Sequence, residues 1–242
     1  MKKIKVDKAI ILAAGLGKRM RPVTNELPKP LVKVFDKRII ETILDALIAA
    51  EINDIYVVCG YLAEKFQCLK DKYPALNFLL NNQYYESNNI SSILCAKDLI
   101  RNAYVIEGDL FLKNPSIITP FQSESNYVGI YKNHTADWCF YKDKDGYINK
   151  LTVGGNNCYQ MVGISYWTAK DGEKLARHAE KVFASPEGKT LYWDEIALTI
   201  FKSEYKIGIR ECVVNDVVEI DTFQELQEID SRYLNWSLQN ET

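Results

Sequence analysis

The chain has 242 residues, of which 47% are hydrophobic and 26% are charged, and its formal net charge is −2. These values are ordinary for a folded globular protein, and the near-neutral charge gives no sign of a nucleic-acid partner. No run of about 18 apolar residues occurs, which argues against a transmembrane helix, so we expect no membrane partner.

Strand and helix patterns alternate along the first half of the chain. Apolar runs predict strands at residues 8–12, 54–59, 77–80 and 104–107. Helices are predicted at residues 39–50, 63–72 and 91–99. Strands that alternate with helices indicate βαβ units and a mostly parallel sheet, so we expect an α/β fold.

Short strands dominate the second half, which we interpret as a small antiparallel addition. Strands are predicted at residues 127–131, 138–142, 148–153, 161–167, 206–212 and 217–220, with turns at 144–146 and 154–157. Helices are predicted at 169–184, 193–201 and 222–234, and residues 235–242 are expected to fray. No linker or internal repeat is evident, so we expect a single domain over residues 1–242.

Cysteine usage bears on the compartment. The six cysteines are scattered, none forms a C-x-x-C pair, and the chain has only two histidines. This pattern argues against a zinc site and is typical of reduced thiols in a cytosolic protein. We therefore expect a cytoplasmic location. The short apolar run before Gly15 faintly resembles a signal peptide, but we interpret it as a buried strand with its exit loop.

Residues 12–31 follow the first predicted strand and carry the strongest motif. Open α/β folds bind ligands in loops at the carboxyl ends of strands. Gly15 and Gly17 let the backbone approach a ligand closely, and the N–H groups of such a loop can bind phosphate oxygens. Positive charge is added at the same place by Lys18, Arg19 and Arg21. Met20 breaks the dinucleotide pattern G-x-G-x-x-G, and the Walker pattern has no match.

The string at residues 12–31 resembles the signature L-A-A-G-x-G-x-R-x-x-P-x-T-x-x-x-P-K-x-L of the nucleotidyltransferases that make nucleoside-diphosphate sugars and alcohols. The resemblance implies a Rossmann-like three-layer α/β/α sandwich with a mostly parallel mixed sheet, and nucleotidyl transfer with release of pyrophosphate. It implies two catalytic residues: Arg19 binds the triphosphate, and Lys29 contacts the phosphates at the reacting centre. A tight turn and a rigid surface loop would also account for the glycines and prolines, but not for this spacing of Arg19 and Lys29.

Two aspartates are candidate metal ligands. Nucleoside triphosphates react as magnesium complexes, and Mg²⁺ prefers hard oxygen ligands. Asp109 follows the predicted strand at 104–107, and Asp221 follows the one at 217–220. From the residues alone, Asp109 could be a turn residue and Asp221 a helix N-cap. The resemblance implies that both bind Mg²⁺, because the family carries one such aspartate after a central strand and another in a late I-D-[ST] segment.

The second half contains candidates for acceptor binding. Aromatic faces bind quaternary ammonium groups, and a carboxylate adds charge complementarity, although each such residue alone is more often part of a core. The segments around Trp138, 191–194 and 219–221 resemble those of bacterial CTP:phosphocholine cytidylyltransferases, whose aromatics and acids line a choline pocket. The acceptor-binding residues implied are Trp138, Tyr192, Asp194 and Glu219.

The same resemblance extends to the nucleotide side, where residues 81–89 are similar to the base-binding segment of those enzymes. The nucleotide-binding residues implied are Leu12, Ala13, Ala14, Gly15, Gly17, Lys18, Arg19, Asn81, Tyr84, Asn88 and Asn89. Residues 1–125 would form a nucleotide-binding half, and residues 126–242 an acceptor-binding half.

The resulting hypothesis is a magnesium-dependent transfer of CMP from CTP to phosphocholine. The chain contains no Glu-Lys-Pro segment, which counts against a sugar acceptor. Three alternatives remain open: phosphoethanolamine or 2-aminoethylphosphonate as acceptor, a sugar 1-phosphate with UTP or dTTP, and a non-catalytic nucleotide-binding module. The sequence does not indicate an oligomeric state.

Overall fold

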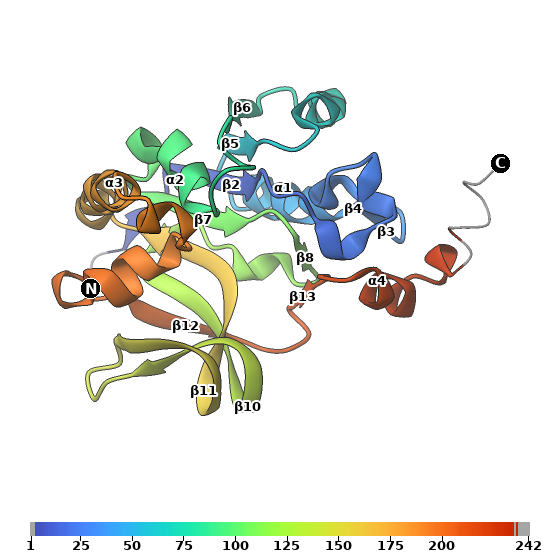
Figure 1. Cartoon of the computed structure of the whole chain (residues 1–242). Coiled ribbons are helices and arrows are strands. Elements are labelled where there is room, and N and C mark those ends of the chain that lie inside the picture. Colours follow the sequence, from blue (N-terminus) through green and yellow to red (C-terminus); the bar gives the residue numbers. More distant parts are fainter. Residues whose placement is uncertain (1–2, 235, 237–242) are drawn as a thin grey trace.

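The computed structural model describes residues 3–234 and 236, and its centre is one large mixed sheet (Figure 1). Within the described residues this sheet has seven strands in the order β12-β10-β11-β7-β2-β5-β6. Their bounds are β2 (Lys8–Ala13), β5 (Asp54–Cys59), β6 (Asn77–Leu80), β7 (Ala103–Glu107), β10 (Asn126–Lys142), β11 (Ile148–Trp167) and β12 (Gly208–Cys212). Strands β6, β5, β2 and β7 run parallel, β12 runs parallel to β10, and β11 is antiparallel to both of its neighbours. The predicted α/β fold with a mostly parallel mixed sheet is confirmed.

Helices cover both faces of the sheet, because the side chains of β2 alternate between two apolar cores. Ile11 belongs to the core that includes α1 (Ile39–Ala49). Ile10 belongs to the core that includes α2 (Ile90–Cys95) and α3 (Ala169–Phe183), which lie side by side in Figure 1. Strands buried on both faces are near-continuous apolar runs, so their sequence pattern was recognisable. The arrangement is the expected three-layer sandwich.

The second half differs from the prediction of four separate short strands between residues 127 and 167. They form two long strands, β10 and β11, which pair antiparallel with several register shifts. The turn-prone segment at 154–157 stays in the ladder because Gly155 pairs with Thr135 and Asn156 with His134. Gly154 has a positive φ of 71°, which glycine adopts readily, and β11 continues through it. The antiparallel addition therefore continues the central sheet (Figure 1).

Two predicted helices take tighter or wider forms. Residues 63–71 form a 3-10 helix, and the helix predicted at 193–201 contains a π-helical turn at Ile196–Ile200. The helix predicted at 91–99 divides into α2 and a 3-10 turn at Lys97–Leu99. Within the described residues no helix is both long enough and apolar enough to cross a membrane.

The helix predicted at 222–234 is also interrupted. Helix α4 (Phe223–Ile229) ends before Asp230, whose backbone is extended, and a 3-10 turn follows at Ser231–Tyr233. The prediction that residues 235–242 fray falls almost wholly outside the described residues.

Small elements complete the fold. Two-stranded ribbons pair β1 (Ile4–Lys5) with β9 (Phe121–Gln122), β3 (Lys33–Val34) with β4 (Lys37–Arg38), and β8 (Leu110–Leu112) with β13 (Val217–Glu219). Further 3-10 turns lie at Lys18–Met20, Val23–Asn25, Lys29–Leu31, Pro115–Ile117, Glu187–Thr190 and Lys202–Glu204.

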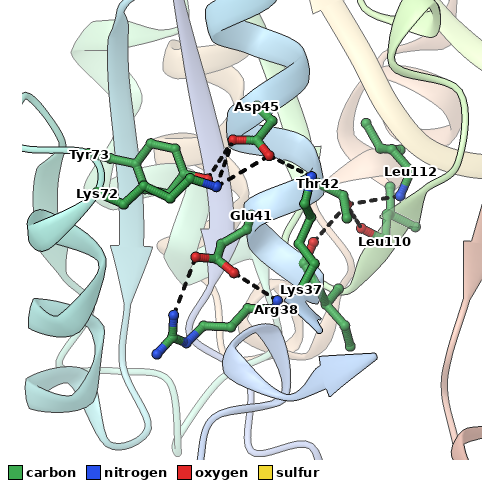
Figure 2. Close-up of polar contacts among 10 residues, drawn as sticks. Lys37, Arg38, Glu41, Thr42, Asp45, Lys72, Tyr73, Leu110 and Leu112 are labelled. Atoms are coloured by element: carbon green, nitrogen blue, oxygen red, sulfur yellow. Dashed lines mark hydrogen bonds and ion pairs between the residues drawn. The ribbon is translucent and has the colours of Figure 1, made fainter. Parts of the chain in front are cut away.

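Polar contacts fix α1 against β8, the strand that begins directly after Asp109 (Figure 2). The hydroxyl of Thr42 accepts a hydrogen bond of 2.9 Å from the backbone N–H of Leu112. The carboxylate of Asp45, on the same helix, accepts one of 2.6 Å from the hydroxyl of Tyr73. Because Thr42 is buried, its bond to β8 cannot be exchanged for one to water, and this holds the strand in place.

Candidate active site

The loop after β2 is held in an unusual backbone shape by its second glycine. Gly17 has a φ of 58°, in the left-handed region that favours glycine, and its carbonyl oxygen accepts a hydrogen bond of 2.8 Å from the hydroxyl of Thr24. A Cβ atom on Gly17 would lie only 3.1 Å from the Cβ of Lys29. At Gly15 a Cβ would meet nothing within 4 Å, because that residue faces open space. The two glycines therefore have different roles: Gly17 makes the turn, and Gly15 leaves the backbone accessible to a ligand.

This loop forms one wall of a cavity of about 360 Å³, which we call the nucleotide cavity. Among its lining residues are Leu12, Ala13, Ala14, Gly15, Gly17, Lys18, Arg19 and Asn89, which the sequence predicted for nucleotide binding, and the predicted catalytic Lys29. Leu16, Pro30, Ser92 and Glu107 also line it, and the sequence did not indicate them. The cavity lies at the carboxyl ends of β2 and β7, the expected position for a ligand in an open α/β sheet.

The pairing of β8 with β13 brings the two predicted metal ligands together. Asp109 directly precedes β8, and Asp221 lies just beyond the end of β13, whose Glu219 is opposite Leu110. The side chain of Thr222, rather than that of Asp221, caps α4 by accepting a hydrogen bond from a backbone N–H. The N-cap alternative for Asp221 is therefore wrong, and Asp221 instead lines the nucleotide cavity.

The four residues on which the sequence hypothesis depends lie in one cluster. The ammonium nitrogen of Lys29 is 2.7 Å from a carboxylate oxygen of Asp109 and 2.8 Å from one of Asp221. The guanidinium of Arg19 is 2.8 Å from the other carboxylate oxygen of Asp221. Lys29 is buried, and burial alone would lower its pKa, but the two carboxylates outweigh burial and raise it. The lysine is therefore held as a cation between two anions.

Glu219 joins Asp109 and Asp221 in a carboxylate cluster. One oxygen atom from each residue lies within 4.8 Å of the others, the arrangement of a candidate metal site. Desolvation, followed by the negative charges of Asp109 and Asp221, raises the pKa of Glu219 to about 8. Carboxylate oxygens are the hard ligands that Mg²⁺ prefers, so the donor set fits the cation that the sequence predicted. Glu219, predicted for acceptor binding, lies with the metal candidates as well as in the second cavity described next.

A second cavity of about 600 Å³, which we call the acceptor cavity, adjoins the first. The residues that line both cavities are Arg19, Asn89, Glu107, Asp109 and Asp221. All four predicted acceptor residues line the acceptor cavity: Trp138, Tyr192, Asp194 and Glu219. The rings of Trp138 and Tyr192 meet edge to face, with centroids 5.7 Å apart and an interplanar angle of 65°. Residues more than fifty positions apart in sequence thus form one aromatic corner.

Asp194 is a buried carboxylate on the wall of the acceptor cavity. It is 5% exposed, and it accepts a hydrogen bond of 2.7 Å from the hydroxyl of Tyr127. Burial raises its pKa to about 7, although the hydrogen bond from Tyr127 acts in the opposite direction. No salt bridge to Asp194 is present within residues 3–234 and 236. A cation bound in the cavity would relieve this unpaired buried charge.

Several residues lie away from where the motifs suggested. Trp193, in the aromatic segment, does not line the acceptor cavity: its ring packs on Tyr127 in the core, with centroids 6.0 Å apart. Asn81 and Tyr84 line neither cavity. Asn81 is buried, and its amide donates hydrogen bonds to the hydroxyls of Ser91 and Ser92. It therefore shapes the cavity wall indirectly, through Ser92.

The sequence did not predict several residues that line the acceptor cavity: Glu107, Leu110, Asp137, Leu151, Met161, Val162, Gly163 and Glu195. Asn88 also lines it, although it was predicted for nucleotide binding. Two carboxylates among them were adjacent to predicted residues, since Asp137 precedes Trp138 and Glu195 follows Asp194. Glu107 ends a buried strand two positions before Asp109, and a charged side chain at that point was the available signal.

The sequence also resembles enzymes of known activity. The sequence model of the nucleotidyl transferase family matches residues 8–133. The 2-aminoethylphosphonate cytidylyltransferase of Lancefieldella rimae is 38% identical over 229 residues, which cover 93% of each chain. The choline-phosphate cytidylyltransferase of Streptococcus pneumoniae is 35% identical over 92% of this chain and 96% of its own.

Solved structures give the same comparison in three dimensions. The structure of CTP:phosphocholine cytidylyltransferase from Streptococcus pneumoniae matches with a TM-score of 0.86 and 33% identity, over 95% of this chain and 99% of that one. An inositol-1-phosphate CTP transferase from T. maritima matches with a TM-score of 0.72 at 15% identity, and this likeness concerns the fold alone.

Proposed function

This chain belongs to the nucleotidyltransferase family and is a cytidylyltransferase, and we propose that its acceptor is phosphocholine. The proposed reaction transfers CMP from CTP to phosphocholine and yields CDP-choline and pyrophosphate. One observation carries the choice of acceptor: the aromatic corner of Trp138 and Tyr192 shares a cavity with the buried carboxylate of Asp194. Aromatic faces attract a quaternary ammonium group, and the carboxylate supplies the opposite charge.

The shared wall of the two cavities supports direct transfer between the substrates. A phosphate oxygen of the acceptor attacks the α-phosphorus of CTP and forms a new O–P bond. The bond from the α-phosphorus to the oxygen that bridges to the β-phosphate breaks, and its electron pair leaves with pyrophosphate. No covalent enzyme intermediate is needed, because positioning and charge neutralisation lower the barrier.

The charged residues divide this work. Arg19 and Lys29, which line the nucleotide cavity, supply positive charge for the phosphates of CTP. The carboxylates of Asp109, Glu219 and Asp221 would hold Mg²⁺. When bound there, the cation would neutralise charge on the phosphate oxygens. The ammonium group of Lys29 lies between two of these carboxylates, which places its positive charge beside the candidate cation site.

A second candidate acceptor is 2-aminoethylphosphonate, which has a primary ammonium group. It is favoured by the carboxylates of Asp137, Asp194 and Glu195 in the acceptor cavity, which can accept hydrogen bonds from N–H groups. A quaternary ammonium has no N–H to donate and gains more from aromatic faces. The two acceptors therefore depend on different parts of the same cavity.

The proposal is tested by comparing kcat/KM for phosphocholine, phosphoethanolamine and 2-aminoethylphosphonate, each with CTP and Mg²⁺, by pyrophosphate release. UTP or dTTP with glucose 1-phosphate serves as the sugar-nucleotide arm. The highest kcat/KM with phosphocholine would support the proposal, and a higher value with either primary amine would select the second candidate. Nucleotide binding without turnover on any acceptor would indicate a non-catalytic module.

The variant Trp138→Ala separates the two modes of head-group binding. A desolvated cation–π contact contributes up to about 2 kcal/mol, which corresponds to about thirtyfold in affinity. We expect KM for phosphocholine to rise by about tenfold or more, with KM for CTP within about twofold of its original value. Equal increases in both KM values would mean that Trp138 supports the fold and not the choline head group.

A further inference from the structure

A closed set of hydrogen bonds joins the nucleotide side of the site to the acceptor side. The amide of Asn89 donates to a carboxylate oxygen of Glu107 at 3.3 Å, and its oxygen accepts from the backbone N–H of Trp193 at 3.0 Å. The indole N–H of Trp193 donates to the same oxygen of Glu107 at 3.1 Å. Hydrogen bonds thus join three segments that are far apart in the chain at one carboxyl group.

Neighbouring contacts strengthen the same joint. The backbone N–H of Asn88 donates to the carbonyl oxygen of Lys189 at 2.8 Å, and its side-chain amide donates to that of Thr190 at 3.2 Å. Residues 88–89 lie at the start of α2, beside the nucleotide cavity, whereas residues 189–193 lead directly into Asp194 of the acceptor cavity. A shift of either segment therefore disturbs the other.

Glu107 is fixed in its position between the two cavities. It lines both of them, as Asn89 does. Gly163, on the adjacent strand β11, has a φ of 73°, and a Cβ atom there would lie 3.0 Å from the Cγ of Glu107. The strand therefore leaves only enough room for the glutamate chain. Its carboxylate stays at the boundary of the cavities, where both hydrogen-bond donors can reach it.

We propose that Glu107 is a positioning residue that couples the two substrate sites, so that nucleotide bound against Asn89 orders the Trp193–Asp194 segment for the acceptor. The identity of the acceptor rests on the proposed function, but the coupling does not. The physical reason is conformational entropy. The first ligand bears the entropy cost of ordering the shared segments, and the second ligand binds to segments that are already ordered. Coupling of this kind is reciprocal, and each substrate tightens the other by the same factor.

The test measures that factor with α,β-methylene CTP, which cannot release pyrophosphate. Calorimetry gives its Kd with and without saturating phosphocholine, and the Kd of phosphocholine with and without the analogue. In the unaltered enzyme we expect each ligand to tighten the other by about fivefold or more. In Glu107→Met, which keeps the chain length but has no oxygen acceptor, we expect the factor to fall to about one. Glu107→Gln keeps an oxygen that can accept both bonds, so it should retain the coupling.

A matched control separates coupling from general damage to the core. Gln122→Met makes the equivalent change at a buried side chain that bonds to Thr119 and Asn126 and lines neither cavity. It should lower the melting temperature and leave the coupling factor unaltered. The proposal is overturned if Glu107→Met retains the factor of the unaltered enzyme, if Glu107→Gln loses it along with Glu107→Met, or if Gln122→Met loses it too.

A second measurement does not depend on the acceptor. Hydrogen exchange of residues 189–195 is followed on adding CTP, UTP, ATP or dTTP alone. Whichever nucleotide binds should slow exchange in this segment of the unaltered enzyme but not of Glu107→Met. Binding without such protection would refute the coupling even if phosphocholine proved to be the acceptor. Slower exchange of residues 189–195 in an enzyme without affinity for phosphocholine would support the coupling and refute the choice of acceptor.

Discussion

The variant Asp194→Asn should gain stability relative to the original protein as the pH rises, because Asp194 is a buried carboxylate without a cationic partner. Its pKa is raised from 3.8 to about 7 by burial. The folded state therefore binds more protons than the unfolded state between these two values. The stabilisation from the protonated form is full below about pH 4 and is lost as the pH rises through about 7. An asparagine does not titrate over this range, so its contribution to the unfolding free energy stays constant. Its side-chain oxygen can still accept the hydrogen bond from Tyr127.

The magnitude follows from the difference between 3.8 and about 7. At 1.36 kcal/mol per pKa unit, the loss is about 4 kcal/mol over the whole window, and about 2–3 kcal/mol of it falls between pH 5 and pH 8. The unfolding free energy of Asp194→Asn relative to the original protein should therefore increase by about 2–3 kcal/mol over that interval. Urea denaturation at pH 5, 6, 7 and 8 measures this difference, and comparing it across pH cancels any fixed effect of the amide.

Asp45→Asn is the control for this experiment. The pKa of Asp45 is lowered below 3.8, because its hydrogen bonds from Lys37 and Tyr73 outweigh its desolvation (Figure 2). The stabilisation it gives is present above its unfolded pKa and is lost only as the pH falls through the lower, folded value. Its stability difference should therefore be constant between pH 5 and pH 8. If Asp194→Asn gave an equally constant difference, the carboxylate would not be desolvated, and the case for a cation-seeking pocket would fail.

Three further predictions concern the phosphate and metal side of the site. Lys29→Met should tighten Mn²⁺ binding without nucleotide by about tenfold, measured by electron paramagnetic resonance, because the ammonium group no longer competes for the carboxylates of Asp109 and Asp221; unaltered affinity would contradict this competition. Asp109→Asn should lower kcat by about 100-fold or more while the melting temperature stays near its original value, and full activity would refute the metal role. Gly17→Ala should destabilise the fold by about 1 kcal/mol, because φ is 58° there and the new Cβ would crowd Lys29; a melting temperature equal to that of the unaltered enzyme would argue against a rigid turn.

The parts of the site that could be predicted from sequence are those whose chemistry lies in a continuous motif. Arg19 and Lys29 stand within one twenty-residue string, so their shared loop was evident before their contacts were known. Asp109 and Asp221 could be identified as strand-end carboxylates. Their meeting with Lys29 depends on the three-residue strands β8 and β13, which are too short for any periodicity to reveal.

Other features depend on spatial neighbours that the pattern does not contain. The turn residues at 154–157 led to a wrong prediction of a strand end. The partner strand β10 has a register shift opposite them, so the two irregular segments pair with each other. Asn81 resembled a base-binding residue, but its amide is engaged by Ser91 and Ser92. Glu107 could not be assigned because the direction of a strand-end side chain is set by its neighbours, here Gly163 and Trp193.

The late position of β13 has a consequence for synthesis of the enzyme. Lys29 contacts Asp221 across 192 positions of sequence, and Met20 belongs to the same apolar core as Ile220 and Leu226. A nascent chain that has emerged only as far as β12 already contains every strand of the central sheet, yet it lacks two of the three carboxylates of the cluster. A chain cut before residue 219 would therefore keep all seven strands of the described central sheet and still be unable to assemble the carboxylate cluster.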